Sequence, residues 1–135
     1  MGMDVCGHNP SALEGKHFRA NIWQWPLLIK VITTLCPQET SGCKYWETNE
    51  GDGLNSAQAL VLAEALERKL RSGEVAFALC DPAIISNAKS PVAVSIVAWF
   101  RLQGFETPHG EAIIDEKFVA EFTAFVRASG GFSIW

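Results

Sequence analysis

Two segments of the chain combine apolar residues at helical spacing with signals for both ends of a helix. The first lies between Asn55 or Ser56, either of which can cap a helix N-terminus, and Gly73, which suits a C-terminus. The second follows Asp115 and ends at Gly130. Residues three and four apart share one side of a helix, so each segment predicts a helix with one buried face. The predicted faces are Ala59, Leu62, Ala63, Leu66 and Leu70 in the first helix, and Phe118, Val119, Phe122, Phe125 and Val126 in the second.

Two further helices are expected nearer the N-terminus. One begins near Trp25 and Pro26, because proline suits a first helical turn, and Pro37 ends it. The other is short and capped by Ser11, with Glu14 completing a capping box. The first ten residues contain glycine and an Asn-Pro pair and are interpreted as irregular chain.

Strands are expected in two places. Residues 43–48 are rich in aromatic and β-branched side chains, and residues 132–135 alternate large and small ones. Residues 74–80 fit either a helix or a strand. Residues 92–102 form an almost uncharged apolar run, whose length favours a buried helix over a buried strand.

These elements predict an α+β fold. We expect a mainly helical single domain over residues 1–135, with about four helices and a small sheet that includes the 43–48 region and the C-terminal strand. A chain of 135 residues can build one hydrophobic core but hardly two. Residues 1 and 2 are interpreted as an expression remnant before a native start at Met3.

Composition argues against several classes of protein. With 48% hydrophobic residues and five tryptophans, the chain does not resemble a disordered one. No run of about 18 apolar residues is free of charges or helix breakers, so no membrane span is expected. A net charge of -4 argues against general nucleic-acid binding, which needs a basic surface. The N-terminus lacks a charged and then apolar leader, so we expect a cytoplasmic protein with reduced cysteines.

The cysteines do not have the spacing of a zinc site. Cys6 and His8 are separated by one residue, and Cys36 and Cys43 by six. Structural zinc sites usually use two pairs of ligands with about two to four residues between the members of a pair. We therefore expect no metal and no cofactor, although these four side chains could still converge in space.

A thiol–imidazole pair is a second chemistry that the N-terminal region could support. Cys6 could pair with His8 or with His17, and Glu14 could orient His17 from one turn away. No surrounding motif supports this interpretation, because a cysteine and a histidine co-occur in most chains of this size.

The Gly51-Asp52-Gly53 segment precedes a helix N-terminus, where free N–H groups can bind an anion. It lacks the Lys-Ser/Thr ending of a P-loop and the glycine spacing of a dinucleotide-binding loop. It also lacks the acidic alternation of a calcium-binding EF-hand loop. A turn that leads into a capped helix explains the segment without a ligand.

Residues 17–25 are the most unusual stretch, because aromatic side chains alternate there with Arg, Asn and Gln. Trp and Arg are enriched among the residues that dominate binding at interfaces, and small-molecule pockets use the same combination. The alternative is an ordinary core beside a helix start, with Arg19 extending past it to solvent. The candidate ligand-binding or partner-binding residues are Arg19, Asn21, Trp23, Trp25, Trp46 and Asp52.

Several stretches form a combination that covers both ends and the middle of the chain. They are Asp4–Pro10, Phe18–Trp23, Tyr45–Trp46 with Asn49–Leu54, and Phe118–Trp135. In these stretches the chain resembles a family of small uncharacterised bacterial and phage or mobile-element proteins, to which no activity is assigned. Such proteins often carry a cysteine-rich zinc-knuckle insertion before the last helix, where this chain has the apolar run 92–102 and only Cys80 nearby. The resemblance therefore implies a mobile-element context but no metal-dependent role.

The function expected from these observations is that of a small cytoplasmic binding or interaction module without catalytic activity. Its partner would be a protein or a small molecule, because the aromatic residues exceed what one core needs. The apolar run at 92–102 is also compatible with a homodimer. The alternative is an enzyme acting on a polar anionic substrate, with Arg19 holding the anion and Asp52 or His17 transferring a proton. This alternative requires the three side chains to share one cleft.

Overall fold

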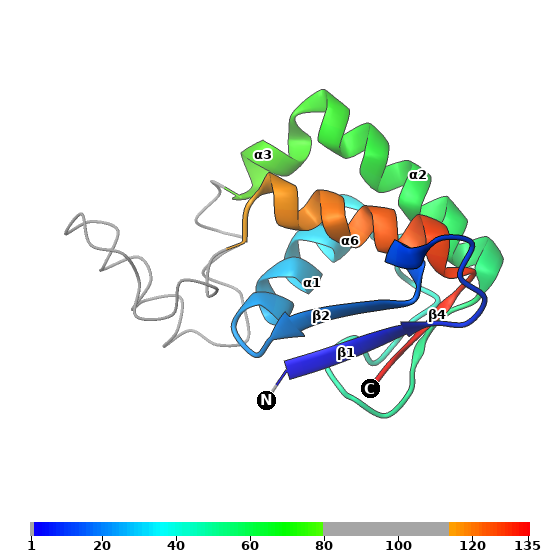
Figure 1. The fold of residues 1–135 in the computed structure, drawn as a ribbon. Helices are drawn as coiled ribbons and strands as arrows, with labels where there is room; N and C mark the ends of the chain where they lie inside the picture. Colours follow the sequence, from blue (N-terminus) through cyan, green and yellow to red (C-terminus); the bar gives the residue numbers. More distant parts are fainter. Residues whose placement is uncertain (1, 80–113) are drawn as a thin grey trace.

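In the computed structural model, which describes residues 2–79 and 114–135, helices pack against one face of a four-stranded sheet (Figure 1). The described residues therefore have the α+β fold that the sequence predicts. The elements in chain order are β1 (Gly2–Gly7), the 3-10 helix η1 (Leu13–Gly15), β2 (His17–Asn21), α1 (Gln24–Leu35), β3 (Gly53–Leu54), α2 (Ser56–Ser72), α3 (Glu74–Leu79), α6 (Glu116–Ser129) and β4 (Phe132–Ile134).

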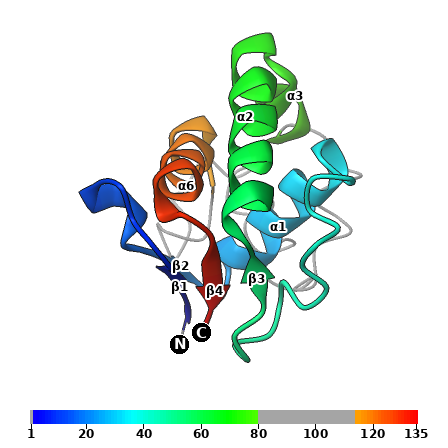
Figure 2. The same cartoon turned by 90° about the vertical axis from the view of Figure 1, so that its right-hand side faces the viewer.

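The sheet is antiparallel throughout, with the strand order β2-β1-β4-β3. Strand β1 lies in the middle of it, paired with β2, the next strand in the sequence, and with β4 at the other end of the chain. Seen along the strands, the helices lie on one side of the sheet only (Figure 2). No described helix covers the other side, which we call the open face.

The two helices with the clearest sequence signals begin and end where those signals predict. The Asn55 side chain accepts a hydrogen bond from the Gln58 backbone N–H at 2.8 Å, and the Gln58 side chain accepts one from Asn55 at 3.0 Å. Gly73 ends α2 in the left-handed conformation, with φ of 84°. Asp115 caps α6, and Gly130 ends it with φ of 67°. Both helices are therefore specified by short-range contacts.

Aromatic rings join the helices to the covered face of the sheet. The Phe122 ring of α6 lies 5.2 Å from Phe18 of β2, 6.1 Å from Trp25 of α1 and 6.4 Å from Phe132 of β4, measured between centroids. These distances suit edge-to-face and tilted packing. The predicted faces of α2 and α6 contribute to the same core, and all their residues are buried except Leu70 and Phe118, which are half-buried.

The structure corrects two predictions for the N-terminal region. The first ten residues are not irregular, because β1 occupies Gly2–Gly7. This strand has glycine at both ends and one fully buried side chain, Val5, so its pairing with two other strands determines its conformation. Ser11 does not cap an α-helix: the short helix η1 is a 3-10 turn that follows Ala12, without a side-chain cap.

Residues 43–48 are also not a strand, and the sheet does not include them. They form a loop, and the two-residue strand β3 occupies the edge of the sheet next to β4. The ambiguity at 74–79 is resolved in favour of the helix α3. Residue 80 and the predicted helix at 92–102 lie outside the described residues.

Candidate functional site

Three charged or polar side chains meet on the open face, and we call them the Asp4 cluster. Arg19 donates from Nη1 to both carboxylate oxygens of Asp4, at 2.8 and 3.0 Å, and His17 Nε2 lies 2.9 Å from Oδ1. The hydrogen bond from His17, with further contributions from Arg19, lowers the pKa of the Asp4 carboxyl. The cluster therefore presents an ionised carboxylate that orients one cation and one imidazole.

The alternation of side chains along the strands places this cluster on the open face. Val5 and Phe18 point into the core, so their neighbours Asp4, His17 and Arg19 point to the opposite side. The side chains of His17 and Arg19 are 50% and 59% exposed, and that of Asp4 is 36% exposed. The cluster is thus accessible to a partner at the surface.

Trp135 extends the same row across the sheet. Asp4 exchanges two backbone hydrogen bonds with Trp135, at 3.1 and 2.6 Å, so the two residues lie opposite each other. Trp135 is 55% exposed. Its ring covers Gly51, whose φ is +92° and where an added Cβ would lie 2.6 Å from the ring. Gly51 is therefore required both for the turn and for the position of this indole.

Asn21 and Trp23, two of the predicted site residues, lie where β2 passes into α1. The Asn21 side chain accepts hydrogen bonds from the backbone N–H groups of Trp23 and Gln24, at 2.9 and 2.8 Å, and the Gln24 side chain accepts one from Asn21 at 3.1 Å. This reciprocal arrangement resembles a capping box and starts the helix. Trp23 is half-buried beside it. Asn21 therefore has a clear structural role at this position.

Trp25 and Trp46 belong to the core. They are 2% and 5% exposed, and their ring centroids are 6.5 Å apart. Trp25 Nε1 donates to the Trp46 carbonyl at 2.6 Å, and Trp46 Nε1 donates to the Thr40 carbonyl at 3.2 Å. Both indole N–H groups are thus satisfied inside the protein, as buried tryptophans require.

Asp52 organises the loop that the sequence pattern assigned to a strand. Its Oδ2 accepts from the backbone N–H groups of Lys44 and Tyr45, at 2.9 and 2.8 Å, and Oδ1 accepts from Gly53 at 2.9 Å. These bonds, led by that from Tyr45, lower the pKa of Asp52. A carboxylate engaged in this way holds backbone in place and is poorly suited to accept a proton.

The candidate residues therefore occupy separate places. Arg19 and His17 share Asp4, whereas Asp52 lies beyond β4 at the opposite edge of the sheet. Sequence reasoning missed Asp4, the residue that joins the two. The sequence does contain a signal for the strand that carries Asp4, because the apolar Val5 lies between Asp4 and Cys6. The surrounding glycines instead indicated irregular chain.

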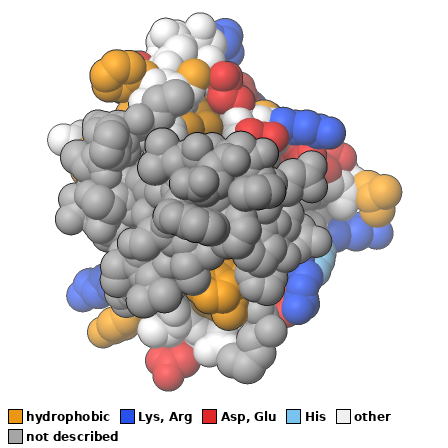
Figure 3. Space-filling model, turned by 90° about the vertical axis from the view of Figure 1, so that its left-hand side faces the viewer, with side chains coloured by type: hydrophobic (Ala, Val, Ile, Leu, Met, Phe, Trp, Pro, Cys, Tyr) orange, Lys and Arg blue, Asp and Glu red, His pale blue; other side chains and the backbone are white. Residues whose placement is uncertain are grey.

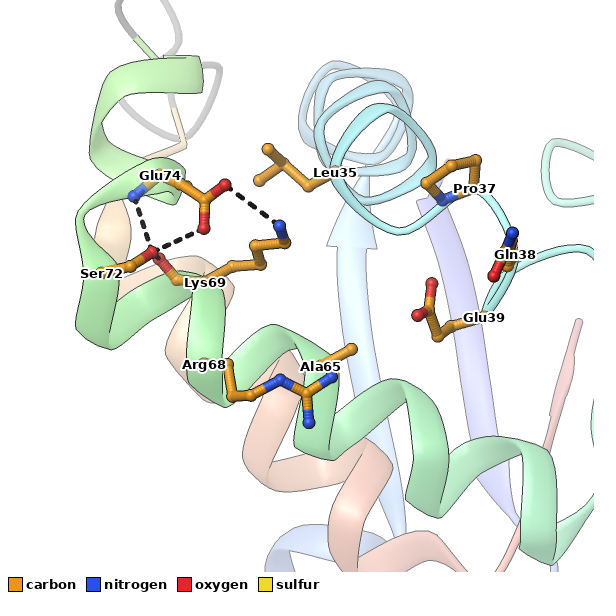
Figure 4. A pocket seen from close by; sticks show the side chains of 9 residues that line it. All are labelled: Leu35, Pro37, Gln38, Glu39, Ala65, Arg68, Lys69, Ser72 and Glu74. Carbon is orange, nitrogen blue, oxygen red and sulfur yellow. Dashed lines mark hydrogen bonds and ion pairs between the residues drawn. The ribbon is translucent and has the colours of Figure 1, made fainter.

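Two clefts lined by described residues lie elsewhere, and none of the predicted site residues lines either. One, of about 420 Å³, separates the end of α1 from α2 and α3 (Figure 4). In it, Glu74 accepts from Lys69 at 3.0 Å and from Ser72 at 2.7 Å. The other, of about 460 Å³, lies beside α6 and contains the ion pair of Glu67 and Arg127. Each cleft therefore contains one pair of oppositely charged side chains that contact each other.

Several large hydrophobic side chains of the described residues are exposed. Around the margin of the view in Figure 3, those that are visible are separated by charged and polar groups. Single exposed apolar residues are normal on soluble folds. The large ones are Leu13, Ile22, Tyr45, Leu60, Val61, Phe77 and Trp135.

The cysteines within 2–79 are free thiols. Cys36 and Cys43 are buried, and Cys6 is partly exposed. Among the described residues, no group of three or more His, Cys, Asp or Glu side chains is placed to hold a metal ion, so Cys6, His8, Cys36 and Cys43 do not form a common site. Over the same residues, no helix is long and apolar enough to cross a membrane.

Comparison with known proteins adds no relative: no protein-family model, curated protein or solved structure gives a significant match to this chain.

Proposed function

We propose that this protein is a small binding module without catalytic activity that contacts a protein partner through the open face of its sheet. The observation that carries the proposal is the row formed by Arg19, Asp4 and Trp135. Neighbouring strands are about 4.8 Å apart, so Arg19 and Trp135 stand about 10 Å from each other. Arg and Trp are the residue types that most often dominate binding energy at protein interfaces.

The geometry of Arg19 suits this role. Nη1 contacts both carboxylate oxygens of Asp4, which holds the guanidinium beside β1, and these bonds do not use the Nε and Nη2 donors, which a partner can engage. Holding the side chain in advance lowers the entropy lost on binding. The partner would supply carboxylate or carbonyl oxygens to Arg19 and an apolar group to Trp135.

The wider setting is part of the proposal and is based on the sequence alone. We place the module in the cytoplasm and in the mobile-element context that the resemblance implies. A second copy of the chain is one form that the protein partner could take, which would give a homodimer. Nucleic acid is not the expected partner because the net charge is -4.

The test compares the open face with a control on the helical layer. Tagged wild-type protein, the double variant Arg19→Ala with Trp135→Ala, and the control Arg71→Ala are used to capture proteins from a host lysate, and the captured proteins are quantified. Arg71 is exposed on α2. We expect at least one protein to be captured equally by wild type and Arg71→Ala, and at least about thirtyfold less by the double variant, since even one such contact is worth about 2 kcal/mol. Identical captured sets for all three proteins would refute the proposal.

The second candidate is an enzyme that acts on a polar anionic substrate. The pairing of His17 with Asp4 beside Arg19 favours it, because a carboxylate can orient an imidazole for proton transfer. Asp52 has no part in it, since its oxygens accept three backbone N–H groups. Titration with acetate and inorganic phosphate, followed by NMR of the His17 ring, separates the candidates: an enzyme of this kind requires saturable anion binding at Arg19.

A further inference from the structure

Cys6 lies beside His17 on the open face, and the proposed binding function makes no use of this pair. The two residues are directly opposite in the register of β1 and β2. The next pair along the strands, Gly7 and Lys16, is joined by a backbone hydrogen bond of 3.0 Å. Hydrogen-bonded and non-hydrogen-bonded pairs alternate, so Cys6 and His17 form a non-hydrogen-bonded pair. The Cβ atoms of such pairs are about 4.5–5.5 Å apart.

Both side chains point away from the core. Their neighbours Val5 and Phe18 are buried on the covered face, which directs Cys6 and His17 to the open one. A partly exposed thiol and an exposed imidazole are therefore cross-strand neighbours on this face.

The Asp4 carboxylate determines which ring nitrogen of His17 is available. An ionised carboxylate can only accept hydrogen bonds, so Nε2, 2.9 Å from Asp4 Oδ1, carries a hydrogen. In the neutral ring the free electron pair is then on Nδ1. Asp4, and not Glu14 as the sequence suggested, therefore orients His17 and leaves Nδ1 able to take a proton.

Burial separates Cys6 from the other described thiols. Cys36 and Cys43 are 1% and 4% exposed, and burial raises their pKa values to about 11 and about 12. Thiols of this kind are unreactive, because the thiolate is the nucleophile. Within the described residues, accessibility and a neighbouring base occur together only at Cys6.

We propose that Cys6 is a site of reversible thiol–disulfide exchange with small disulfides, with His17 as its base and Asp4 as a positioning residue. The Cys6 sulfur attacks one sulfur of the disulfide while His17 Nδ1 takes the thiol proton. The S–S bond of the small molecule breaks, and its electron pair leaves on the second sulfur, which then receives the proton as a free thiol. Cys6 is oxidised to a mixed disulfide, and the small disulfide is reduced to one thiol for each molecule bound.

Among residues 2–79 and 114–135, few charged or titratable groups adjoin His17. Asp4 contacts it from β1, and Arg19, two residues along β2, shares that carboxylate. Lys16 precedes it in the chain. His8, beyond the end of β1, instead lies 2.6 Å from the Ser133 hydroxyl. Ser133 is opposite Cys6 on β4, so His8 is a second exposed histidine near this thiol, and His8→Asn tests which of the two histidines is the base.

The experiment measures the rate at which native protein reacts with dithiobis(nitrobenzoic acid), an aromatic disulfide whose released thiol is coloured. Cys80 is replaced by serine in every protein, so that the described cysteines account for the signal. The proteins compared are Cys80→Ser alone and with Cys6→Ser, His17→Asn or His8→Asn. Glutathione disulfide then replaces the aromatic disulfide, and the mixed disulfide is located by mass spectrometry.

We expect one rapidly reacting thiol, which Cys6→Ser removes. At pH 7, His17→Asn should slow it about tenfold, whereas His8→Asn should leave it unchanged. At pH 9 the effect of His17→Asn should largely disappear, because thiols ionise there without a base. An equal effect of His17→Asn at both pH values indicates a purely structural role and overturns the proposal, as does an undiminished rate at pH 7. If His17→Asn does not fold, the reaction rate of Cys6 is compared between native Cys80→Ser and the same protein unfolded in guanidinium. The proposal requires Cys6 to react faster in the native protein, and an equal or slower rate there overturns it.

Discussion

Replacing Trp25 with phenylalanine tests whether this residue belongs to the core or to a binding site. Trp25 is 2% exposed, and its Nε1 donates to the Trp46 carbonyl at 2.6 Å. Phenylalanine keeps an aromatic ring but removes the donor, which leaves a buried carbonyl unpaired at a cost of about 1–3 kcal/mol. The smaller ring also leaves a cavity, which adds about 1 kcal/mol. We therefore expect Trp25→Phe to lower the free energy of unfolding by about 2–4 kcal/mol.

Urea unfolding followed by circular dichroism measures this change. With a slope of about 1.5 kcal/mol per molar urea, the transition midpoint should fall by about 1–3 M. Trp135→Phe is the matched control: its ring is 55% exposed, and the expected change is within about 0.5 kcal/mol. If Trp25→Phe is no more destabilising than Trp135→Phe, the reasoning that places Trp25 in the core is refuted.

Three further predictions concern the loop, the sheet edge and an ion pair. Hydrogen bonds led by that from the Tyr45 N–H lower the pKa of Asp52, so its contribution to stability is present above the unfolded pKa of about 4 and is lost as the pH falls through the lower folded value. The urea midpoint should therefore fall less between pH 5 and pH 2 for Asp52→Asn than for the wild type. An equal fall in both proteins would contradict a stabilising role of the Asp52 carboxylate. A Cβ at Gly53 would lie 1.8 Å from a backbone carbonyl of β4, so Gly53→Ala should lower the melting temperature by several degrees; an unaltered melting curve would mean that β3 is not paired as described. The Glu67 and Arg127 side chains are 31% and 44% exposed, so a double-mutant cycle to alanine should give a coupling of about 0.5–1 kcal/mol that falls with added salt, and a coupling insensitive to salt would argue against the ion pair.

The binding proposal and the Cys6 proposal share a surface but fail independently. Loss of partner capture depends on Arg19 and Trp135, whereas the thiol rate depends on Cys6 and His17. Asp4 connects them, because one carboxylate orients both the guanidinium and the imidazole. Asp4→Asn should therefore weaken both functions if both proposals hold.

The sequence alone determined the helices α1, α2 and α6 and the final strand. Asn55 and Gly73 act within a few residues of the backbone groups that they satisfy, so the ends of α2 can be recognised from neighbours in the chain. The same holds for Asp115 and Gly130 at the ends of α6.

Tertiary structure alone decided the middle of the sheet and the location of the candidate site. Strand β1 exists because it pairs with residues at positions 17–21 and 132–134, and no local signal records such distant partners. Residues 43–48 have strand-like composition, yet Asp52 binds their backbone in a loop. Tertiary structure also determines the environment of each of these tryptophans. The indole N–H groups of Trp25 and Trp46 donate to carbonyls in the core, whereas Trp135 lies on the open face. Helix caps act between neighbours in sequence, whereas strand pairing and the burial of rings depend on which distant segments meet.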